Sequence, residues 1–287
     1  MTFSSFPPEL IEMLTYKRPA WSETEEAFIN DFIRPLGVFE DSYGNLWKEV
    51  GEESRIMWSS HTDTVHRTEG RQTLKLDGPN IGIKWDKTSN CLGADDAAGV
   101  WLMTEMIRAE VPGLYIFHRD EEAGGNGSKY IVEEHPEFLR GIDFAIALDR
   151  KGYKDVITHQ MGQRCCSDDF AWSLADILGP QFQPNDGGVF TDTAFYRSLI
   201  PECTNISVGY HGQHGPTETQ NLSFLIGLRD RLIDNDFSTL VCDRDPSKDF
   251  DDDIYTYIIN HPLQVADALE AMQITTSDLK RWSKFFA

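Results

Sequence analysis

The chain has 287 residues, and its 47 acidic and 26 basic side chains give it a formal net charge of −21 and a pI near 4.6. This charge excludes nucleic acids and anionic membrane surfaces as partners, because binding either would meet like-charge repulsion. The length is sufficient for one large domain, or one domain with an appendage, around a sizeable buried core.

The cysteines are odd in number and have no CxxC spacing, which excludes a zinc ribbon and a secreted disulfide framework. The first nine residues lack a basic segment followed by an apolar run, and no later stretch approaches about 18 uninterrupted apolar residues. We therefore expect a soluble, cytoplasmic protein. The adjacent Cys165 and Cys166 could form a redox pair, but two partly buried thiols are the simpler interpretation. The five cysteines are Cys91, Cys165, Cys166, Cys203 and Cys242.

The first part of the chain predicts two helices and two short strands. Apolar residues recur at helical spacing between residues 8 and 37, and Ser22 provides an N-cap. A turn at residues 41–45 then separates strands around residues 38–39 and 46–50.

A repeated order of strand, polar residues and helix follows. Buried strands are expected at 55–60, 114–117, 144–148 and 204–209, and helices at 97–110, 128–134 and 222–232. Residues 243–253 are acidic and turn-rich, which predicts a linker, and two or three short helices are expected in residues 254–286. This alternation predicts an α/β fold with a largely parallel sheet, which places its chemistry at the carboxyl ends of the strands.

Acidic and imidazole side chains occur just after these strands. In chain order they are His61 and Asp63, Asp95 and Asp96, Glu121 and Glu122, Asp149, and His214. Two metal ions about 3.5–4 Å apart require one bridging carboxylate, roughly two further ligands each, and an open position for water. The series supplies five ligands and a spare carboxylate for general-base work, and therefore predicts a two-metal hydrolase.

Single motifs in this series have simpler explanations. An isolated HxD such as His61-Thr62-Asp63 is usually a surface coincidence, although its carboxylate can orient the imidazole. A helix N-cap explains one of Asp95 and Asp96 and leaves the other unexplained. Glu121 and Glu122 end a strand and can divide the work between metal and water. The combination is what makes the prediction specific.

The blocks HTD, GADDAAGV, EEAGGNGS, ALD and HGPTE resemble those of the co-catalytic di-zinc exopeptidases, such as the double-zinc and tripeptide aminopeptidases. The resemblance spans roughly residues 9–233 and includes Asp41-Ser-Tyr-Gly44-Asn45 and Thr191-Asp192-Thr193-Ala194-Phe195. It implies a three-layer α/β/α sandwich with a mixed, mostly parallel sheet, of the phosphorylase/hydrolase-like type, carrying two Zn²⁺ ions, with Co²⁺ or Mn²⁺ as alternatives.

The resemblance also implies roles for individual residues. His61 and Asp149 would hold one metal, Glu122 and His214 the other, and Asp95 would bridge them. Asp63 would orient His61, Glu121 would be the general base, and a cis peptide bond would join Asp95 and Asp96. His211 is the alternative to His214, because it also follows a tyrosine. Tyr210 is a candidate to stabilise the oxyanion, although a core tyrosine is the commoner role.

Two departures define the expected domain organisation. The spans 63–95 and 149–214 are too short for the lid or dimerisation domains that some relatives insert there. We expect one catalytic domain at residues 1–240 and an acidic linker with a helical extension at 241–287. The loop at 65–90 would form the rim of the site.

The implied activity is zinc-dependent hydrolysis of an amino-terminal peptide bond, with a peptide or small amide as substrate. A carboxypeptidase or amide deacylase using the same site is the first alternative. A catalytically silent binding or scaffold protein is the second. Asp168 or Asp169 near the site would favour a substrate ammonium group, and Arg164 or Arg197 would favour a carboxylate.

Overall fold

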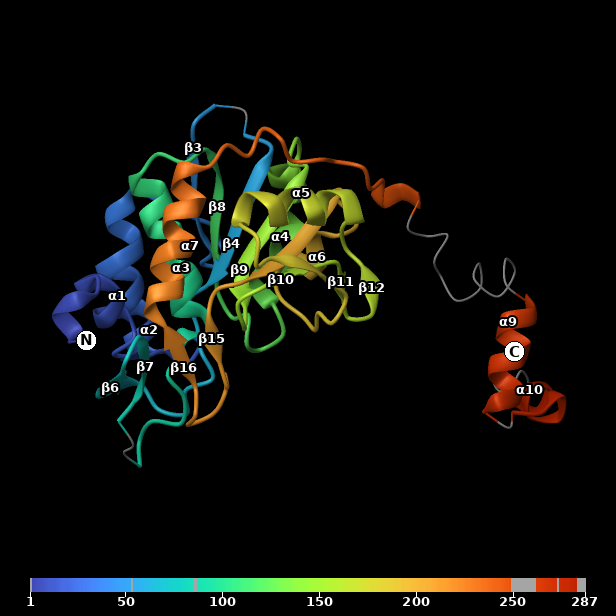
Figure 1. Cartoon of the computed structure of the whole chain (residues 1–287), viewed down its shortest axis with the longest axis horizontal. Helices are drawn as coiled ribbons and strands as arrows, with labels where there is room; N and C mark the ends of the chain where they lie inside the picture. The colour runs from blue at the N-terminus through green and yellow to red at the C-terminus, as the bar shows by residue number, and fades with distance from the viewer. Residues whose placement is uncertain (1, 53, 85–86, 249–261, 273, 283–287) are drawn as a thin grey trace. The chain divides into compact units, whose positions relative to one another are not determined.

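The computed structural model describes residues 2–52, 54–84, 87–248, 262–272 and 274–282. The chain folds as two compact units, Met1–Arg244 and Asp245–Ala287, which are described separately. The first unit is built on an eight-stranded sheet with the order β13-β10-β14-β9-β4-β8-β3-β2 (Figure 1). Its strands are β2 (Phe39–Glu40), β3 (Leu46–Val50), β4 (Ile56–His61), β8 (Gly113–His118), β9 (Phe144–Arg150), β10 (Asp155–Ile157), β13 (Gln183–Asn185) and β14 (Glu202–Ser207).

The centre of this sheet is parallel. β4 pairs in parallel with β8 on one side and β9 on the other, and β14 pairs in parallel with β9. The antiparallel pairs lie toward the edges, where β3 pairs with β8 and with β2, and β10 pairs with β14. The sheet is therefore mixed and mostly parallel, as expected. In the β4 and β8 register His61 faces His118, so both strands end at the same sheet edge.

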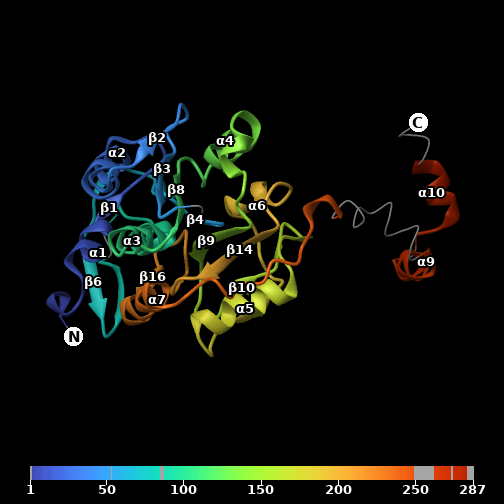
Figure 2. The ribbon, with the colours of Figure 1, turned by 90° about the horizontal axis from the view of Figure 1, so that it is seen from above.

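Helices cover both faces of the sheet and complete the expected three-layer α/β/α sandwich. Seen from above, α1, α3, α5 and α7 lie on one face and α4 and α6 on the other (Figure 2). The larger apolar core fills the first interface, with Trp58, Trp101 and Phe170 fully buried. The helices of this unit are α1 (Pro8–Met13), α2 (Glu23–Phe28), α3 (Ala94–Arg108), α4 (Asn126–Glu134), α5 (Asp168–Leu178), α6 (Thr193–Tyr196) and α7 (Leu222–Asp234).

Local sequence explains where several helices begin. The side chains of Ser22, Ser167 and Asn221 accept hydrogen bonds from backbone N–H groups at the starts of α2, α5 and α7. Helix α3 passes so close to β9 that a Cβ at its residue Gly99 would lie 2.3 Å from the carbonyl oxygen of Leu148. Only glycine permits this approach, which brings the start of α3 beside the end of β9.

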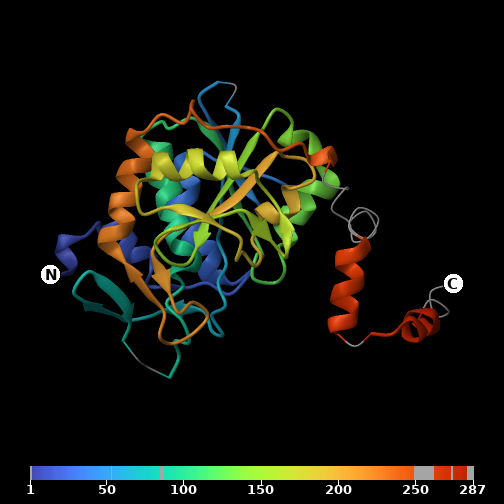
Figure 3. The ribbon, with the colours of Figure 1, turned by 45° about the vertical axis from the view of Figure 1, so that its right-hand side comes forward.

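A second, four-stranded sheet with the order β15-β16-β7-β6 occupies part of the segment expected to be a loop. Its hairpin, coloured teal in Figure 3, extends from one end of the unit. The strands are β6 (Leu74–Asp77), β7 (Asn80–Ile83), β15 (Tyr210–His211) and β16 (Thr219–Asn221), and two minor ribbons join β1 (Tyr16–Lys17) to β5 (Gly70–Arg71) and β11 (His159–Gln160) to β12 (Gln163–Arg164). The hairpin is thus tied to the strands that flank His214.

The second unit contains α9 (Pro262–Ala271) and α10 (Thr276–Trp282), two of the short helices expected beyond residue 254. Residues 249–253 of the predicted linker lie outside the described residues. Within the described ranges, no helix combines the length and the apolar character that crossing a membrane requires. All five cysteines are free thiols, and Cys165 and Cys166 are fully buried.

Candidate metal centre

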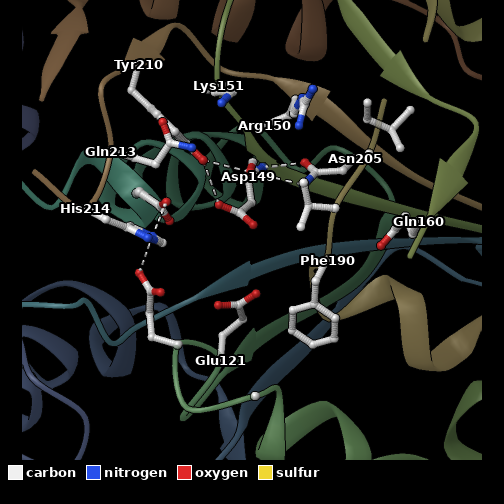
Figure 4. Close-up of a pocket in the computed structure, with 16 residues that line it drawn as sticks. Glu121, Asp149, Arg150, Lys151, Gln160, Phe190, Asn205, Tyr210, Gln213 and His214 are labelled. Atoms are coloured by element: carbon white, nitrogen blue, oxygen red, sulfur yellow. Dashed lines mark hydrogen bonds and ion pairs between the residues drawn. The ribbon is translucent and has the colours of Figure 1, made fainter. Parts of the chain in front are cut away.

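The residues singled out by their order in the sequence converge at the carboxyl ends of the central strands (Figure 4). His61 is the last residue of β4, Glu121 and Glu122 follow β8, and Asp149 is the last residue but one of β9. Asp95 lies at the start of α3 and His214 in the segment after β15.

His61 is buried and faces three carboxylates. Its Nε2 lies 3.1 Å from Asp95, 3.6 Å from Asp149 and 3.9 Å from Glu121. Its Nδ1 lies 3.1 Å from the backbone oxygen of Asp63 and 3.4 Å from that residue's carboxylate. Because a carbonyl can only accept, Nδ1 donates the hydrogen to Asp63, and Nε2 is the nitrogen that faces the three carboxylates.

His214 completes the opposite side of the cluster. Its Nε2 lies 3.1 Å from Asp95 Oδ2 and 3.1 Å from Glu122 Oε1. Asp95 Oδ1 faces His61, so the two oxygens of one carboxylate point to two different imidazoles. His214 has a φ of 63°, a left-handed conformation that non-glycine residues seldom adopt and that is concentrated at functional sites.

The peptide bond between Asp95 and Asp96 is cis, as the resemblance implied. Asp96 does not face the cavity. Its carboxylate accepts hydrogen bonds from the backbone N–H of His61 at 3.2 Å and of Gly99 at 2.9 Å. The second aspartate therefore ties the end of β4 to the first turn of α3.

Glu218, the last residue of the HGPTE block, has a role that the sequence did not indicate. Its side chain is 1% exposed and accepts hydrogen bonds from four successive backbone N–H groups, those of residues 92–95, at 2.8 to 3.2 Å. Burial raises its pKa to about 7, and the negative charge of Asp95 adds to this. Glu218 lies in the same segment as His214. It thus holds the backbone from which the side chain of Asp95 projects.

Arg18 is a second residue of this kind, and it belongs to none of the sequence motifs. It is fully buried. Its Nε donates to the carbonyl oxygen of Thr62 at 2.8 Å and its Nη2 to that of Gly93 at 3.2 Å. Arg18 therefore joins the backbone beside His61 to the backbone beside Asp95, and its charge lies behind the cluster of carboxylates.

Asp149 is held from three sides. Thr191 donates to its Oδ2 at 2.8 Å, and the Asn205 amide brackets its backbone with bonds of 3.0 and 3.1 Å. Tyr210 donates its hydroxyl to the backbone oxygen of Asp149 at 2.8 Å and lies 3.1 Å from Oδ1. Tyr210 lines the cavity, with its hydroxyl engaged by Asp149 in this state.

The electrostatics of the cluster favour positive charge. Burial opposes protonation of His61, but the carboxylates of Glu121, Asp149, Asp63 and Asp95 together raise its pKa well above the usual value. Asp95 and Glu122 raise the pKa of His214 to about 10. Burial, followed by the charge of Asp95, raises the pKa of Asp149. These shifts have one origin, which is negative charge concentrated out of contact with water.

The residues present fit divalent metal ions. Mixed carboxylate and imidazole ligands suit zinc and its neighbours. His61, Asp95 and Glu122 each offer a ligand atom within 4.8 Å of the others, as do His61, Asp96 and Asp149. Glu122 Oε1 is buried, and it faces His214 Nε2 at 3.1 Å, where it helps to raise the pKa of that imidazole. Negative charge buried in this way requires a neighbouring cation, which a bound metal ion would supply.

A cavity of about 400 Å³ opens beside this cluster. Asp95, Glu121, Glu122, Asp149 and His214 line it, together with Tyr210, Arg150, Lys151, Ile157, Gln160, Val189 and Phe190 among others. The Glu121 side chain points into the space (Figure 4).

Several residues considered from the sequence lie elsewhere. None of Asp168, Asp169, Arg164 and Arg197 lines the cavity, and Arg164 pairs with Asp168 at 2.9 Å. The described part of the 65–90 segment contributes no lining residue either, so it does not form the expected rim. His211 packs against Tyr153, with 4.7 Å between ring centroids.

Comparison with known proteins gives one family and a set of similar folds. The sequence matches the model of peptidase family M28 over residues 45–204. Aminopeptidase PepT from Bacillus cereus has a TM-score of 0.62 at 16% identity, covering 79% of this chain and 95% of that one. A tripeptidase from Staphylococcus aureus has 0.59 at 16% identity, covering 79% and 95%.

The Pyrococcus horikoshii TET1 peptidase, which can assemble into a tetrahedron or a large octahedral shell, has a TM-score of 0.55 at 18% identity, covering 78% of this chain and 98% of that one. No curated protein matches the sequence. At these identities the structural matches establish the fold.

Proposed function

Because the chain belongs to peptidase family M28, we propose that it is a metallo-exopeptidase that removes the amino-terminal residue of a peptide, using two divalent ions and Glu121. The observation that carries the proposal is the position of Asp95, whose two carboxylate oxygens face His61 and His214 at 3.1 Å each. A carboxylate shared in this way is what a two-metal site requires.

The ligands would divide between the two ions. His61 and Asp149 would hold one, Glu122 and His214 the other, and Asp95 would bridge. Zn²⁺ suits this set, with Co²⁺ or Mn²⁺ as alternatives. When bound, the ions would polarise the scissile carbonyl and lower the pKa of a water molecule.

Glu121 is suited to move the proton. Its carboxylate makes no hydrogen bond within the part of the chain that the structure describes, and it points into the cavity (Figure 4). It would accept a proton from the attacking water and return it to the amine of the leaving peptide as the C–N bond breaks. Asp63 would keep both Glu121 and His61 in position from behind.

The preference for the amino terminus rests on the relatives, two of which are described as an aminopeptidase and a tripeptidase. A carboxypeptidase or amide deacylase using the same groups is the alternative, and a catalytically silent protein is a further one. The presence of Glu121 argues against the silent form, because loss of the base is the simplest route to inactivity.

The test compares three versions of one dipeptide with the zinc-loaded protein. Free and carboxyl-blocked dipeptides should be cleaved, and the amino-blocked one should not. Cleavage only of the amino-blocked form would identify a carboxypeptidase or deacylase. Elemental analysis after zinc titration should find up to two ions per chain, and finding none bound would contradict the proposal.

A further inference from the structure

The wall of the cavity next to the metal centre is cationic. Arg150 and Lys151 directly follow Asp149 in the chain, and both line the cavity. Figure 4 shows their nitrogen atoms on the side of the cavity opposite Glu121. The acidic side chains of the lining, in contrast, all belong to the proposed metal centre: Asp95, Glu121, Glu122 and Asp149. Bound cations would offset those four charges, and the two basic side chains would then determine the sign of the remaining wall.

The side chain of Lys151 has no ion-pair partner among the described residues. It is exposed and makes no ion pair with any residue in the described ranges, although the chain carries 47 acidic side chains. Its backbone oxygen accepts a hydrogen bond from Ser207 at 2.8 Å, which fixes where the side chain begins. A fixed lysine without a carboxylate partner at the edge of a cavity is available to a ligand.

Two nitrogens of the Arg150 guanidinium are held by hydrogen bonds, and the third has none among the described residues. Its Nε pairs with Asp155 at 3.1 Å, and its Nη2 donates to the carbonyl oxygen of Gly187 at 3.1 Å. Its Nη1 makes no hydrogen bond with the residues that the structure describes. Asp155 offsets part of the charge of Arg150, so Lys151 contributes the net positive charge and Arg150 a pre-positioned donor.

The remaining lining strengthens an interaction with an anion. Ile157, Val189 and Phe190 form apolar sides of the same cavity, and apolar walls strengthen electrostatic interactions by excluding water. Gln160 is 2% exposed, and its Oε1 is buried without a partner while its Nε2 donates to Thr193 at 3.0 Å.

From these contacts we propose that the cavity selects peptides that present a carboxylate to Lys151 and Arg150. The inference rests on the proposed function and specifies its substrate class. The carboxylate can be the side chain of an acidic amino-terminal residue or the free carboxyl terminus of a short peptide. The two sources share one chemistry and are separated by experiment.

The first experiment compares matched substrates with the zinc-loaded wild-type chain. Glutamyl and glutaminyl anilides have the same size and differ only in charge, and trialanine differs from its terminal amide in the same way. We expect kcat/KM to be about tenfold higher for the charged member of at least one pair. A preference in the first pair assigns the carboxylate to the side chain, and a preference in the second assigns it to the terminus.

Variants then assign the preference to the wall. Lys151→Gln should bring the ratio of charged to neutral substrate close to one, and Lys151→Glu should invert it. Lys154→Gln is the matched control, because Lys154 is an exposed lysine three residues away that does not line the cavity. Its ratio should equal that of the wild type. The proposal is overturned by equal rates within both pairs, or by a preference that persists in Lys151→Glu.

A binding measurement separates this inference from the proposed function. In Glu121→Gln, calorimetry with the uncleaved peptides should show tighter binding of the charged member, and the difference should decrease as salt is raised. Wild-type protein that cleaves only neutral substrates would leave the aminopeptidase proposal intact and overturn the carboxylate site. Protein that cleaves nothing would overturn the aminopeptidase proposal, and the binding arm alone would then decide on the carboxylate site.

Discussion

The carboxylate of Asp63 accepts a hydrogen bond from the backbone N–H of Glu121 at 3.0 Å, and its second oxygen accepts one from the next residue, Glu122, at 3.1 Å. Asp63 also lies within 3.4 Å of His61 Nδ1. One buried side chain therefore positions the proposed base and a ligand of each proposed metal.

Asp63→Asn should lower activity and metal affinity together. The amide keeps the size of the side chain but replaces one acceptor oxygen with a donor, which would face a backbone N–H. Loss of a residue that orients metal ligands costs about 10–100-fold. Zinc titration and steady-state rates of this variant check the prediction. Full activity would show that the backbone of Glu121 is held by other contacts.

Glu121→Gln and Glu122→Gln should separate the roles of the paired glutamates. Glu121→Gln should abolish turnover with metal content nearly unchanged, because an amide cannot accept the proton of water. Glu122→Gln should lower metal occupancy. Elemental analysis beside activity distinguishes the two variants. Equal metal loss in both would contradict the division of roles.

His214→Ala should lower the affinity for metal and eliminate activity, because His214 faces Asp95 and Glu122 at 3.1 Å each. His211→Ala is the control, since that ring packs against Tyr153, and its metal content should resemble that of the wild type. Zinc titration of the two variants measures the contrast. Retention of metal by His214→Ala and its loss from His211→Ala would reverse the assignment.

Glu218→Ala should destabilise the fold as well as the site. It leaves four buried backbone N–H groups without their acceptor, and we expect a loss of at least about 3 kcal/mol in the free energy of unfolding. Urea unfolding of the metal-free protein checks this. Glu218→Gln retains one acceptor oxygen and should lie between the alanine variant and the wild type. A loss below about 1 kcal/mol would mean that water replaces the carboxylate.

His66 should make stability depend on pH. Burial, and then the charge of Arg18, lower its pKa to about 4 in the folded protein. Between pH 6.5 and 4 the unfolded chain therefore binds a proton that folded His66 does not, and stability falls as pH is lowered through this window. We expect His66 to account for a loss of about 2 kcal/mol between pH 7 and 5. Urea unfolding at both pH values should show a smaller loss in His66→Gln. An unchanged difference would contradict the prediction.

The strands that carry the site were predictable because they are continuous apolar runs. Residues 56–58 and 144–148 have no alternation, which indicates strands buried on both faces. Helix α5 was not predicted, although Ser167 caps it and Phe170, Leu174 and Leu178 recur at helical spacing. That signal was available. The three-residue strand β10 carried none, because its pairing is set by distant partners.

The candidate metal ligands could be predicted from the sequence, but the residues that hold them in position could not. Arg18 acts through carbonyl oxygens 44 and 75 residues away in the chain, and no local pattern predicts such contacts. The basic residues of the cavity were missed for a different reason. Arg164 and Arg197 were considered because of their residue type, whereas the basic side chains that reach the cavity, Arg150 and Lys151, follow the metal ligand Asp149 directly.

The hairpin of β6 and β7 pairs with β16, the strand that follows His214 by five residues. β7 pairs with β16 through Gly82 and Thr219, and β16 begins immediately after Glu218. A molecule that binds the hairpin more tightly when the metal site is filled must, by thermodynamic reciprocity, raise metal affinity by the same factor. An antibody or peptide raised against this hairpin could thus change the affinity of the site for metal without entering the cavity.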